Sequence, residues 1–477
     1  MPEEKSYGVT EVMASFAVET SFDDLPEDVI KECKRLILDT IGCALGGYTT
    51  DIGRITLSIA RDLGGKSEST VVGSRNKTSC TNAAFVNAKM GNALDSDDVF
   101  YNFSHFASPT LFSALALGER AGVTGKDLIT AFALGYDVAA RVGLSRILPE
   151  GVRGGLINWI VPGSVVAAAK ILRLDVDKML HAIGIGCAYA PVTCAWKSVA
   201  PPASMVKYAD MGLIGFIGVM ASLLAQKGYT ASTSVFEGDQ GFWRFCEAVD
   251  CKYDVMVEKL GESWYIMDSS LKPYPCCRWV HIPLDLFIAI IDKHNLSPEE
   301  IEEVTVRVNP YIFGLASDVA PKDGPSAQFS IPYNISLAAF RVKPSPEWQS
   351  PKLLNDPKVK EFAKKVKLDK DPKIGEILAL PEQPTFGFKR SSASIEVRAR
   401  WGKISDRAEY AKGDPWKPET RMTDRALKDK FKAFASTVLE DSIHGRKKID
   451  EIIEKVYNLE TVKDLAELTK LLSPSPR

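Results

Sequence analysis

The chain has 477 residues, of which 45% are hydrophobic and 25% charged, an ordinary profile for a globular protein long enough to form two or three domains. Its formal net charge of −2 offers no basic surface of the kind that binds nucleic acids or membranes, so we expect partners of neither class. Any attraction for an acidic substrate must then come from a few local lysines and arginines.

Cysteine usage and apolar segments point to an intracellular protein. The nine cysteines are scattered through apolar segments without a spacing pattern, which is typical of reduced thiols. Residues 1–15 lack the apolar core of a secretory signal. The longest apolar run, residues 212–225, is shorter than the roughly 20 residues that span a bilayer, and it predicts a buried core helix. We therefore predict a cytoplasmic protein and leave a mitochondrial association open.

The first 265 residues predict one large helical domain. Residues 69–73 (STVVG) are consistent with a short strand or an extended loop. Several of the predicted helices are rich in Ala, Gly and Ser, which lets helix axes approach closely at the centre of a fold. Helical spacing of apolar residues and helix-end signals predict helices at 26–45, 50–63, 82–94, 109–121, 125–148, 163–172, 176–188 and 204–227.

The sequence changes character after residue 262 and again near residue 405. Residues 423–472 are helical again and too short to form a core alone, which favours their return to the first domain. The predicted fold is therefore mostly α, with a large helical domain of residues 1–265 and 406–477 and an inserted, smaller α+β lid domain of residues 266–405. The elements predicted after residue 262 are strands at 263–268, 301–309 and 392–401, and helices at 280–294, 328–342, 426–439 and 449–456.

Residues 91–108 hold the densest group of titratable side chains, between two predicted helices. They include Asp95, Asp97, Asp98, Tyr101 and His105. A loop pinned at both ends by apolar helices suits acid–base chemistry, because its side chains are held rigidly. Asp and Ser are also ordinary residues at the start of a helix, so the local sequence leaves an acidic helix cap as the alternative.

Two lysines are further candidates for chemistry. Lys207 lies at the start of the apolar run and faces either solvent or a cavity. Lys272 lies in the proline-rich segment LKPYPCC at the predicted domain junction, where ligand clefts often form, although a surface lysine in a linker fits equally well. Lysines can neutralise substrate carboxylates and developing charge while a histidine or aspartate moves a proton.

Metal and nucleotide sites find little support in the sequence. Cys276, Cys277 and His281 lack the second ligand pair that a structural zinc site needs. Residues 95–98 resemble a magnesium-binding acidic cluster, but no further acidic or phosphate-binding element accompanies them. The patterns GxxxxGK[ST], GxGxxG after a strand and GxSxG are absent. We therefore expect neither a metal nor a cofactor.

Five motifs in order resemble the MmgE/PrpD family and span roughly residues 30–335. The resemblance implies a helical domain with an inserted lid, a homodimer, and a cofactor-independent active site lined by Asp95, His105, Lys207 and Lys272. Both lysines are then substrate-binding residues. Cys277 and His281 are the further substrate-binding candidates. The motifs are residues 38–44 (LDTIGCA), 93–98 (ALDSDD) leading to His105, 206–207 (VK) with Gly212, 272–277 (KPYPCC) with His281, and 329–333 (FSIPY).

The resemblance implies a lyase, either a dehydratase or a decarboxylase, that acts on a small di- or tricarboxylate such as 2-methylcitrate or cis-aconitate through a carbanion or enediolate. The sequence departs from the family in residues 151–163, which lack the usual histidine and have Asn158 and Trp159 nearest to it. It also has His105-Phe106-Ala107-Ser108 in place of a His-Pro-Ser turn. An isomerase or epimerase of a small dicarboxylate and an inactive metabolite-binding homologue are therefore the alternatives.

Overall fold

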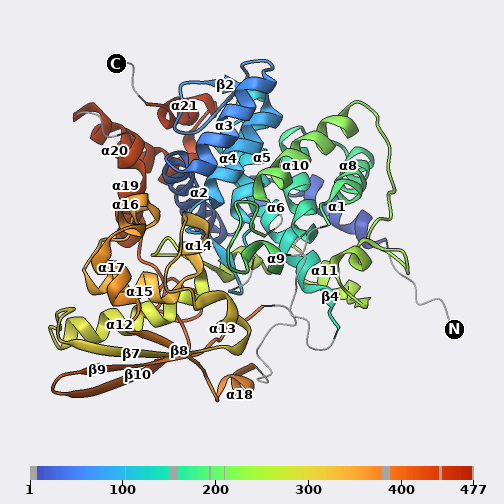
Figure 1. Ribbon diagram of the computed structural model, residues 1–477. Coiled ribbons are helices and arrows are strands. Elements are labelled where there is room, and N and C mark those ends of the chain that lie inside the picture. The colour runs from blue at the N-terminus through green and yellow to red at the C-terminus, as the bar shows by residue number, and fades with distance from the viewer. Residues whose placement is uncertain are drawn as a thin grey trace.

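The chain forms two packed groups of elements, a larger helical one and a smaller one built on a sheet (Figure 1). Helices dominate both, which confirms the prediction of a mostly α chain. The structure is a computed structural model. It describes residues 8–102, 104–149, 158–192, 195–208, 210–378, 387–439 and 443–474.

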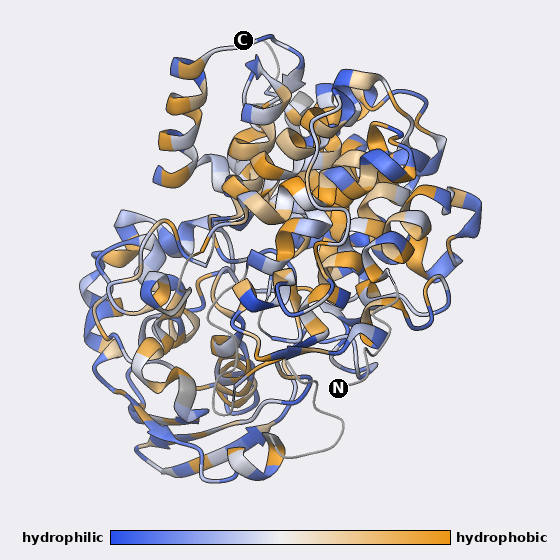
Figure 2. Cartoon of the chain, turned by 90° about the vertical axis from the view of Figure 1, so that its right-hand side faces the viewer, coloured by the Kyte–Doolittle hydropathy of each residue, from blue (hydrophilic) through white to orange (hydrophobic). Residues whose placement is uncertain are grey.

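The larger group combines the first half of the chain with its C-terminal tail. Its buried apolar side chains form one cluster that runs from Val9 to Leu271 and resumes from Met422 to Leu472. Figure 2 shows hydrophobic residues gathered where these helices pack together. The helices are α1 (Val9–Glu19), α2 (Glu27–Tyr48), α3 (Asp51–Leu63), α4 (Cys80–Asn92), α5 (Ala107–Ala121), α6 (Gly125–Leu144), α7 (Val161–Ile171), α8 (Val176–Tyr189), α9 (Ala195–Val199), α10 (Met211–Gln226), α11 (Tyr253–Val257), α19 (Asp424–Leu439), α20 (Ile443–Tyr457) and α21 (Ala466–Thr469).

Short strand pairs connect the helices of this group. Each pair is antiparallel and only two residues long, so these strands form no layer; the first pair closes a local turn, and the other two join segments distant in sequence. The pairs are β1 (Ser69–Thr70) with β2 (Lys77–Thr78), β3 (Val99–Phe100) with β6 (Ser269–Ser270), and β4 (Arg146–Ile147) with β5 (Asp250–Cys251).

Small residues let the central helices approach closely, as the sequence predicts. A Cβ added to Gly163 of α7 would lie 2.3 Å from the carbonyl oxygen of Gly135 in α6. A Cβ added to Gly47 of α2 would lie 2.0 Å from the carbonyl oxygen of Met90 in α4. Helix α2 therefore continues to Tyr48, beyond the predicted end at residue 45, because its glycine serves the contact between helices and does not end the helix.

The smaller group is a four-stranded sheet covered on one face by helices. The strand order is β10-β9-β7-β8, with β7 and β8 parallel and the other neighbours antiparallel. Helices α12 and α15 lie over one face (Figure 1). The elements are β7 (Ile301–Val308), β8 (Val366–Lys370), β9 (Ala393–Ala399), β10 (Gly402–Ala408), α12 (His281–Lys293), α13 (Pro310–Ala316), α14 (Gly324–Phe329), α15 (Ile331–Ala339), α16 (Pro351–Leu354), α17 (Pro357–Ala363) and α18 (Ile374–Leu378).

Two predictions for this part of the chain need correction, and two of its strands were missed. Residues 265–268, expected as a strand, form a 3₁₀ helix. The helix predicted at 328–342 is two helices, because the Ser330 hydroxyl accepts a hydrogen bond from the main-chain N–H of Tyr333 and starts a new helix there. Strands β8 and β10 were not predicted, whereas β7 and β9 confirm the strands at 301–309 and 392–401.

Helix α10 differs from the prediction at its start and on one face. It begins at Met211 instead of residue 204, and Leu213 is 38% exposed, so the helix is buried on one side only.

Across the described ranges, every helix is too short or too polar to cross a membrane. The eight cysteines in the same ranges are all free thiols.

The second apolar cluster runs from Tyr274 to Ala411. The chain therefore passes from the first cluster to the second between residues 271 and 274, and it returns to the first between residues 411 and 422. The predicted domain boundaries at 265 and 406 stay a prediction. A third, small cluster contains Val199 and Ala203 from the larger group and Phe329 from the smaller one, so it joins the two.

Candidate active site

The acidic loop, residues 95–98, lies beside a pair of very short strands. Strand β3 follows the loop directly, and Val99 pairs with Ser270 of β6. Lys272 comes two residues after Ser270. A pairing of only two residues thus brings Lys272, which is distant in sequence, next to Asp95.

A tight turn after β3 folds His105 back onto the carboxylates. Tyr101 and Asn102 have positive φ angles of 47° and 56°, in the left-handed region. The main chains of Phe100 and Ser104 exchange hydrogen bonds of 2.6 and 3.2 Å across the turn. His105 is the next residue and is only 2% exposed. The turn therefore places the imidazole inside the protein, beside the acidic loop.

Asp98 anchors the far end of the acidic loop to helix α5. Its carboxylate accepts hydrogen bonds from the main-chain N–H groups of Phe106 and Ala107 at 3.3 and 3.1 Å, and from the Tyr136 hydroxyl at 2.9 Å. Burial and the neighbouring Asp97 raise the pKa of Asp98 to about 6. Asp98 therefore binds the first main-chain N–H groups of α5 from outside the helix, although the N-cap residue itself is Phe106.

Lys207 lies in a turn before α10 and not within the helix. Asp210 starts the helix by accepting a hydrogen bond from the main-chain N–H of Gly212 at 3.1 Å. The ammonium of Lys89, on α4, binds the Asp210 carboxylate at 3.0 Å and the Met205 carbonyl at 2.6 Å. Because α4 leads into the acidic loop, Lys89 fixes the position of this turn relative to the loop. Lys207 is 1% exposed.

Asp95 is the centre of the charged cluster. Its Oδ1 lies 2.7 Å from Nζ of Lys272 and 3.9 Å from Nζ of Lys207. The same oxygen lies 3.5 Å from Nε2 of His105, and the Tyr208 hydroxyl donates to Oδ2 at 3.0 Å. The structure thus brings together all four residues that the sequence nominates as catalytic.

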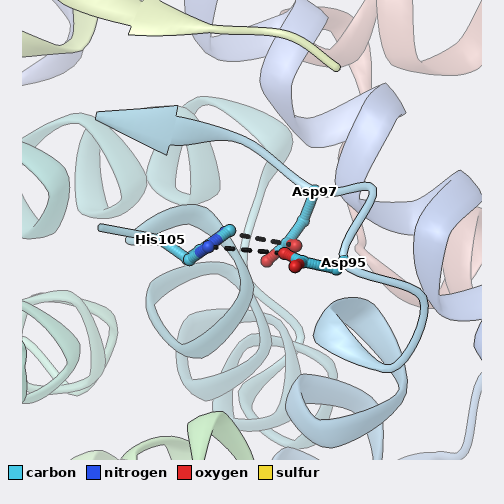
Figure 3. A group of neighbouring side chains, drawn as sticks. All are labelled: Asp95, Asp97 and His105. Atoms are coloured by element: carbon cyan, nitrogen blue, oxygen red, sulfur yellow. Dashed lines mark ion pairs between the residues drawn. The ribbon is translucent and has the colours of Figure 1, made fainter. Parts of the chain in front are cut away.

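A second carboxylate faces the other ring nitrogen of His105. Nδ1 lies 3.3 Å from Oδ1 of Asp97, and Figure 3 shows the carboxylates of Asp95 and Asp97 side by side against the imidazole. Asn92 holds Asp97 by donating from Nδ2 to both of its oxygens, at 3.0 and 3.2 Å. Nδ1 is buried, and the Asp97 carboxylate is the charged group that faces it. Sequence reasoning left Asp97 out of the site, although it lies in the same acidic run.

Asp95 has a strained backbone that Lys272 holds in place. Its φ of 53° lies in the left-handed region, which costs a residue with a side chain on the order of 1 kcal/mol or more. The Lys272 ammonium donates to both the carbonyl oxygen and Oδ1 of Asp95, each at 2.7 Å. Such strain persists where surrounding contacts fix the residue, and it concentrates at functional sites.

The protonation of the cluster follows from burial and neighbouring charges. Burial opposes ionisation of Asp95, but Lys207 and Lys272 outweigh it and hold the pKa of Asp95 well below its usual range. Burial lowers the pKa of Lys207 to about 8, although Asp95 and Asp97 oppose this shift. For Lys272, burial is outweighed by Asp95, and the pKa is raised. Lys272 is therefore a permanent cation at neutral pH, whereas Lys207 titrates close to it.

Two glutamines of the smaller group hold the cluster from the opposite side. Oε1 of Gln328 accepts a hydrogen bond from Lys207 at 2.7 Å, and its Nε2 donates to the Ala93 carbonyl at 2.8 Å. Gln349 donates to the Leu94 carbonyl at 2.8 Å. Neither glutamine was predicted, although Gln328 immediately precedes the FSIPY motif. Both groups of elements therefore contribute to the site.

Cys277 lies at the edge of the cluster. It is half-buried and packs with Tyr208 and Phe329 in the small cluster that joins the two groups. Burial and the Asp95 charge raise the pKa of its thiol to about 12, so the thiol is neutral. Cys277 thus offers an apolar surface beside the charged groups, and its contact with a substrate stays a proposal.

His281 is engaged elsewhere. Its Nε2 lies 3.1 Å from the Cys276 carbonyl oxygen and its Nδ1 lies 3.3 Å from the Arg278 guanidinium. Burial and the charges of Arg278 and Lys272 lower the pKa of His281 well below its usual value. Because both ring nitrogens of this neutral, buried histidine face protein groups, we leave it out of the proposed substrate-binding set.

The residues nearest to the missing family histidine are only partly described. Residues 151–157 lie outside the described ranges. The Trp159 ring packs edge-on against Phe106, with centroids 5.5 Å apart, and Arg146 lies over it at 4.4 Å. Asn158 donates to the Phe245 carbonyl at 2.8 Å. Trp159 therefore supports Phe106, the residue that follows His105.

The donor set of the cluster also bears on metal binding. Asp95, Asp97 and His105 each offer one ligand atom, and these atoms lie within 4.8 Å of one another. However, the Lys272 ammonium lies 2.7 Å from Oδ1 of Asp95, and the Lys207 ammonium lies 3.9 Å from the same oxygen. Like charges repel strongly at such distances in a buried site. The donor set therefore suits a lysine-neutralised acid–base site better than a cation site.

Comparison with known proteins shows to which family the chain belongs. Residues 11–251 match the MmgE/PrpD N-terminal domain, and residues 274–459 match the MmgE/PrpD C-terminal domain. The chain belongs to the MmgE/PrpD family. The resemblance inferred from the five motifs is confirmed, and the acidic loop, Lys207 and His105 all lie within the matched N-terminal part.

Relatives within the MmgE/PrpD family align along nearly the whole chain. The cis-aconitate decarboxylase of Aspergillus terreus is 25% identical over 495 residues, which cover 98% of this chain and 96% of the relative. The cis-aconitate decarboxylase of Homo sapiens is 26% identical over 500 residues, covering 98% and 95%. That of Mus musculus is 26% identical over 489 residues, covering 97% and 93%.

Proposed function

We propose that this protein is a lyase, a decarboxylase or dehydratase, that acts on a small di- or tricarboxylate such as cis-aconitate or 2-methylcitrate. The observation that carries the proposal is the convergence of His105, Lys207 and Lys272 within 4 Å of one oxygen of Asp95, with every one of these groups buried. The names of the relatives, cis-aconitate decarboxylases, support a carboxylate substrate.

In this proposal the buried groups divide substrate binding, charge stabilisation and proton transfer among themselves. Lys207 and Lys272 bind substrate carboxylates and stabilise the carbanion or enediolate, as buried cations do for developing negative charge. His105 transfers the proton. Asp95 and Asp97 orient the imidazole from its two ring nitrogens. The proposed chemistry uses neither a metal nor an organic cofactor.

The two lyase reactions use the same groups in different directions. In a decarboxylation, the electron pair of the breaking C–CO₂ bond moves into the conjugated substrate, and His105 gives a proton to the resulting carbanion. In a dehydration, His105 removes a proton from carbon, and the hydroxyl group leaves as water after protonation. Both pass through a negatively charged intermediate, which is where the two lysines contribute most.

Proton NMR in D₂O tests this function directly. The purified protein is incubated separately with cis-aconitate, 2-methylcitrate, citrate and iminodisuccinate. We expect new vinyl signals of an itaconate-type product, or of an unsaturated acid, from at least one of them. Failure to turn over any of the four, combined with thermal stabilisation by one of them, would instead support an inactive metabolite-binding homologue.

The titration of Lys207 gives the proposed activity a pH limit. With a pKa of about 8, Lys207 is charged below this pH and loses its charge above it. We therefore expect kcat/KM to fall about tenfold per pH unit above pH 8, because a neutral amine no longer binds a substrate carboxylate. The measurement is kcat/KM from about pH 6.5 to 9.5. Lys207→Arg keeps its charge over this range, so the fall should disappear in that variant; an identical fall would assign it to another group.

An epimerase is the second candidate function. His105 and Lys207 both flank Asp95, and the pKa of Lys207, about 8, lets its neutral form accept a proton. Two such bases could remove a proton from one face of a substrate and return it to the other. In the NMR experiment, deuterium entering an otherwise unchanged acid favours this function over a lyase.

The proposal includes a homodimer, as expected from the family. The exposed apolar side chains of Met205, Val206 and Leu213, next to the turn that carries Lys207, support an intermolecular contact on this side. Size-exclusion chromatography with light scattering measures the mass in solution.

A further inference from the structure

A buried ion pair lies behind the acidic loop and joins three distant parts of the chain. Asp39, on α2, is 2% exposed, and its Oδ1 lies 2.7 Å from Nζ of Lys430 on α19. The Lys430 ammonium also donates a hydrogen bond of 2.6 Å to the main-chain carbonyl of Ser96. Ser96 is the residue between Asp95 and Asp97. The pair thus reaches the acidic loop without touching its carboxylates.

The Ser96 contact complements the one made by Lys272. Lys272 binds the carbonyl oxygen of Asp95 at 2.7 Å, and Lys430 binds the next carbonyl, that of Ser96. Two successive peptide groups of the loop are therefore held by two lysines from different segments. Because Asp95 has a left-handed φ of 53°, the orientation of these two peptide groups determines where its carboxylate points.

We propose that Asp39 and Lys430 are positioning residues for the acidic loop and act through the Ser96 carbonyl group. This inference rests on the proposed function, and it gives a role to the LDTIGCA motif, which the proposed mechanism does not use. Asp39 keeps Lys430 charged and directed at the loop. Lys430 holds the peptide group between the two carboxylates that face His105.

The packing of α2 against α19 explains why the pair is rigid. A Cβ added to Gly42 would lie 2.9 Å from the Phe431 ring, so the two helices touch closely one residue away from Lys430. Lys430 is only 9% exposed. An ion pair that served only to join α2 and α19 would need no contact with the loop. The 2.6 Å bond to Ser96 therefore indicates the additional role.

Two variants separate positioning of the loop from general stability. Lys430→Met removes the bond to Ser96. Arg35→Met is the matched control, because Arg35, on α2, is likewise a buried cation that joins α2 to α19, through Asp424, and no described contact links it to residues 95–98. We expect at least a tenfold loss of kcat in Lys430→Met with KM changed less than threefold. The control should keep its kcat at a comparable loss of Tm, and Lys430→Arg should recover most of the activity.

Hydrogen exchange measured by mass spectrometry provides a readout that needs no substrate. We expect amides of residues 91–102 to exchange at least about twofold faster in Lys430→Met than in Arg35→Met. Equal exchange in the two variants would overturn the inference, whether or not any carboxylate is turned over. Faster exchange without turnover in the unmodified protein would leave the inference intact and refute the proposed function. If Lys430→Met does not fold, the Asp39→Asn/Lys430→Met double variant, which leaves no lone buried charge, is tested by the same criterion.

Discussion

Replacing Lys272 by methionine is expected to lower kcat/KM by about a thousandfold or more. The ammonium neutralises the buried Asp95, holds its strained main chain, and binds a substrate carboxylate in the proposed mechanism. Loss of one buried donor at a developing negative charge typically costs about 100- to 1,000-fold. Here the same change also leaves the Asp95 charge with weaker compensation, which raises the pKa of Asp95 and disturbs its contact with His105. Steady-state kinetics with the substrate found by NMR measures the loss.

Loss of a buried ion-pair partner also destabilises a protein, by about 3–5 kcal/mol, and this effect needs its own control. Arg141 is 1% exposed on its side chain and pairs with Asp137 at 2.5 Å, within α6. Arg141→Met should therefore lower Tm by an amount similar to Lys272→Met while retaining kcat. Retention of more than a tenth of kcat/KM in a folded Lys272→Met variant would contradict the assigned role.

The burial of the cluster has a consequence for substrate entry. Asp95, His105, Lys207 and Lys272 are all 2% exposed or less, so a carboxylate cannot reach them in this conformation. From the smaller group, Gln328 and Gln349 cover the site by hydrogen bonds to Lys207 and to the carbonyl groups of Ala93 and Leu94. In the proposed mechanism these hydrogen bonds open for substrate entry, and their closure excludes water from the charged intermediate.

Helices whose apolar residues recur at helical spacing could be predicted from the sequence, and so could strands in which apolar and polar residues alternate. Strand β9 (ASIEVRA) alternates buried and less buried residues along its length, which is the pattern the prediction used. Strand β10 (GKISDRA) lies at the sheet edge with mostly exposed residues, so no apolar pattern marks it. The start of α10 was misplaced because the apolar run alone does not show that Asp210 caps a helix beginning at Met211.

Only those site residues that lie in the recognised motifs could be predicted from the sequence. The resemblance nominated Asp95, His105, Lys207 and Lys272, and the structure places them together. The residues it missed act through geometry that no local pattern encodes: Gln328 reaches Lys207 over a separation of 121 residues, and Lys430 reaches Ser96 over 334. Such contacts depend on how the two groups of elements pack.

Replacing His105 by glutamine is expected to lower kcat about 100- to 10,000-fold, because the proposed mechanism assigns the proton transfer to this side chain. KM should change only a few-fold, since both lysines remain in place to bind substrate carboxylates. Exchange of substrate protons with D₂O, followed by NMR, should disappear in parallel with turnover. Circular dichroism and Tm establish that the variant is folded. A variant that keeps proton exchange would assign the transfer to another group, with Lys207 the first to consider.

The role of Asp97 can be separated from that of His105 by a double-mutant cycle. Asp97 faces Nδ1 of His105 at 3.3 Å, so we expect Asp97→Asn alone to lower kcat by acting through the imidazole. If this is its main role, Asp97→Asn should cost little more once His105 is already glutamine, because residues that act as a unit are not additive. Fully additive losses would show that Asp97 contributes independently of His105. In that case Asp97 would contact the substrate directly, and the acidic loop would supply two catalytic groups instead of one.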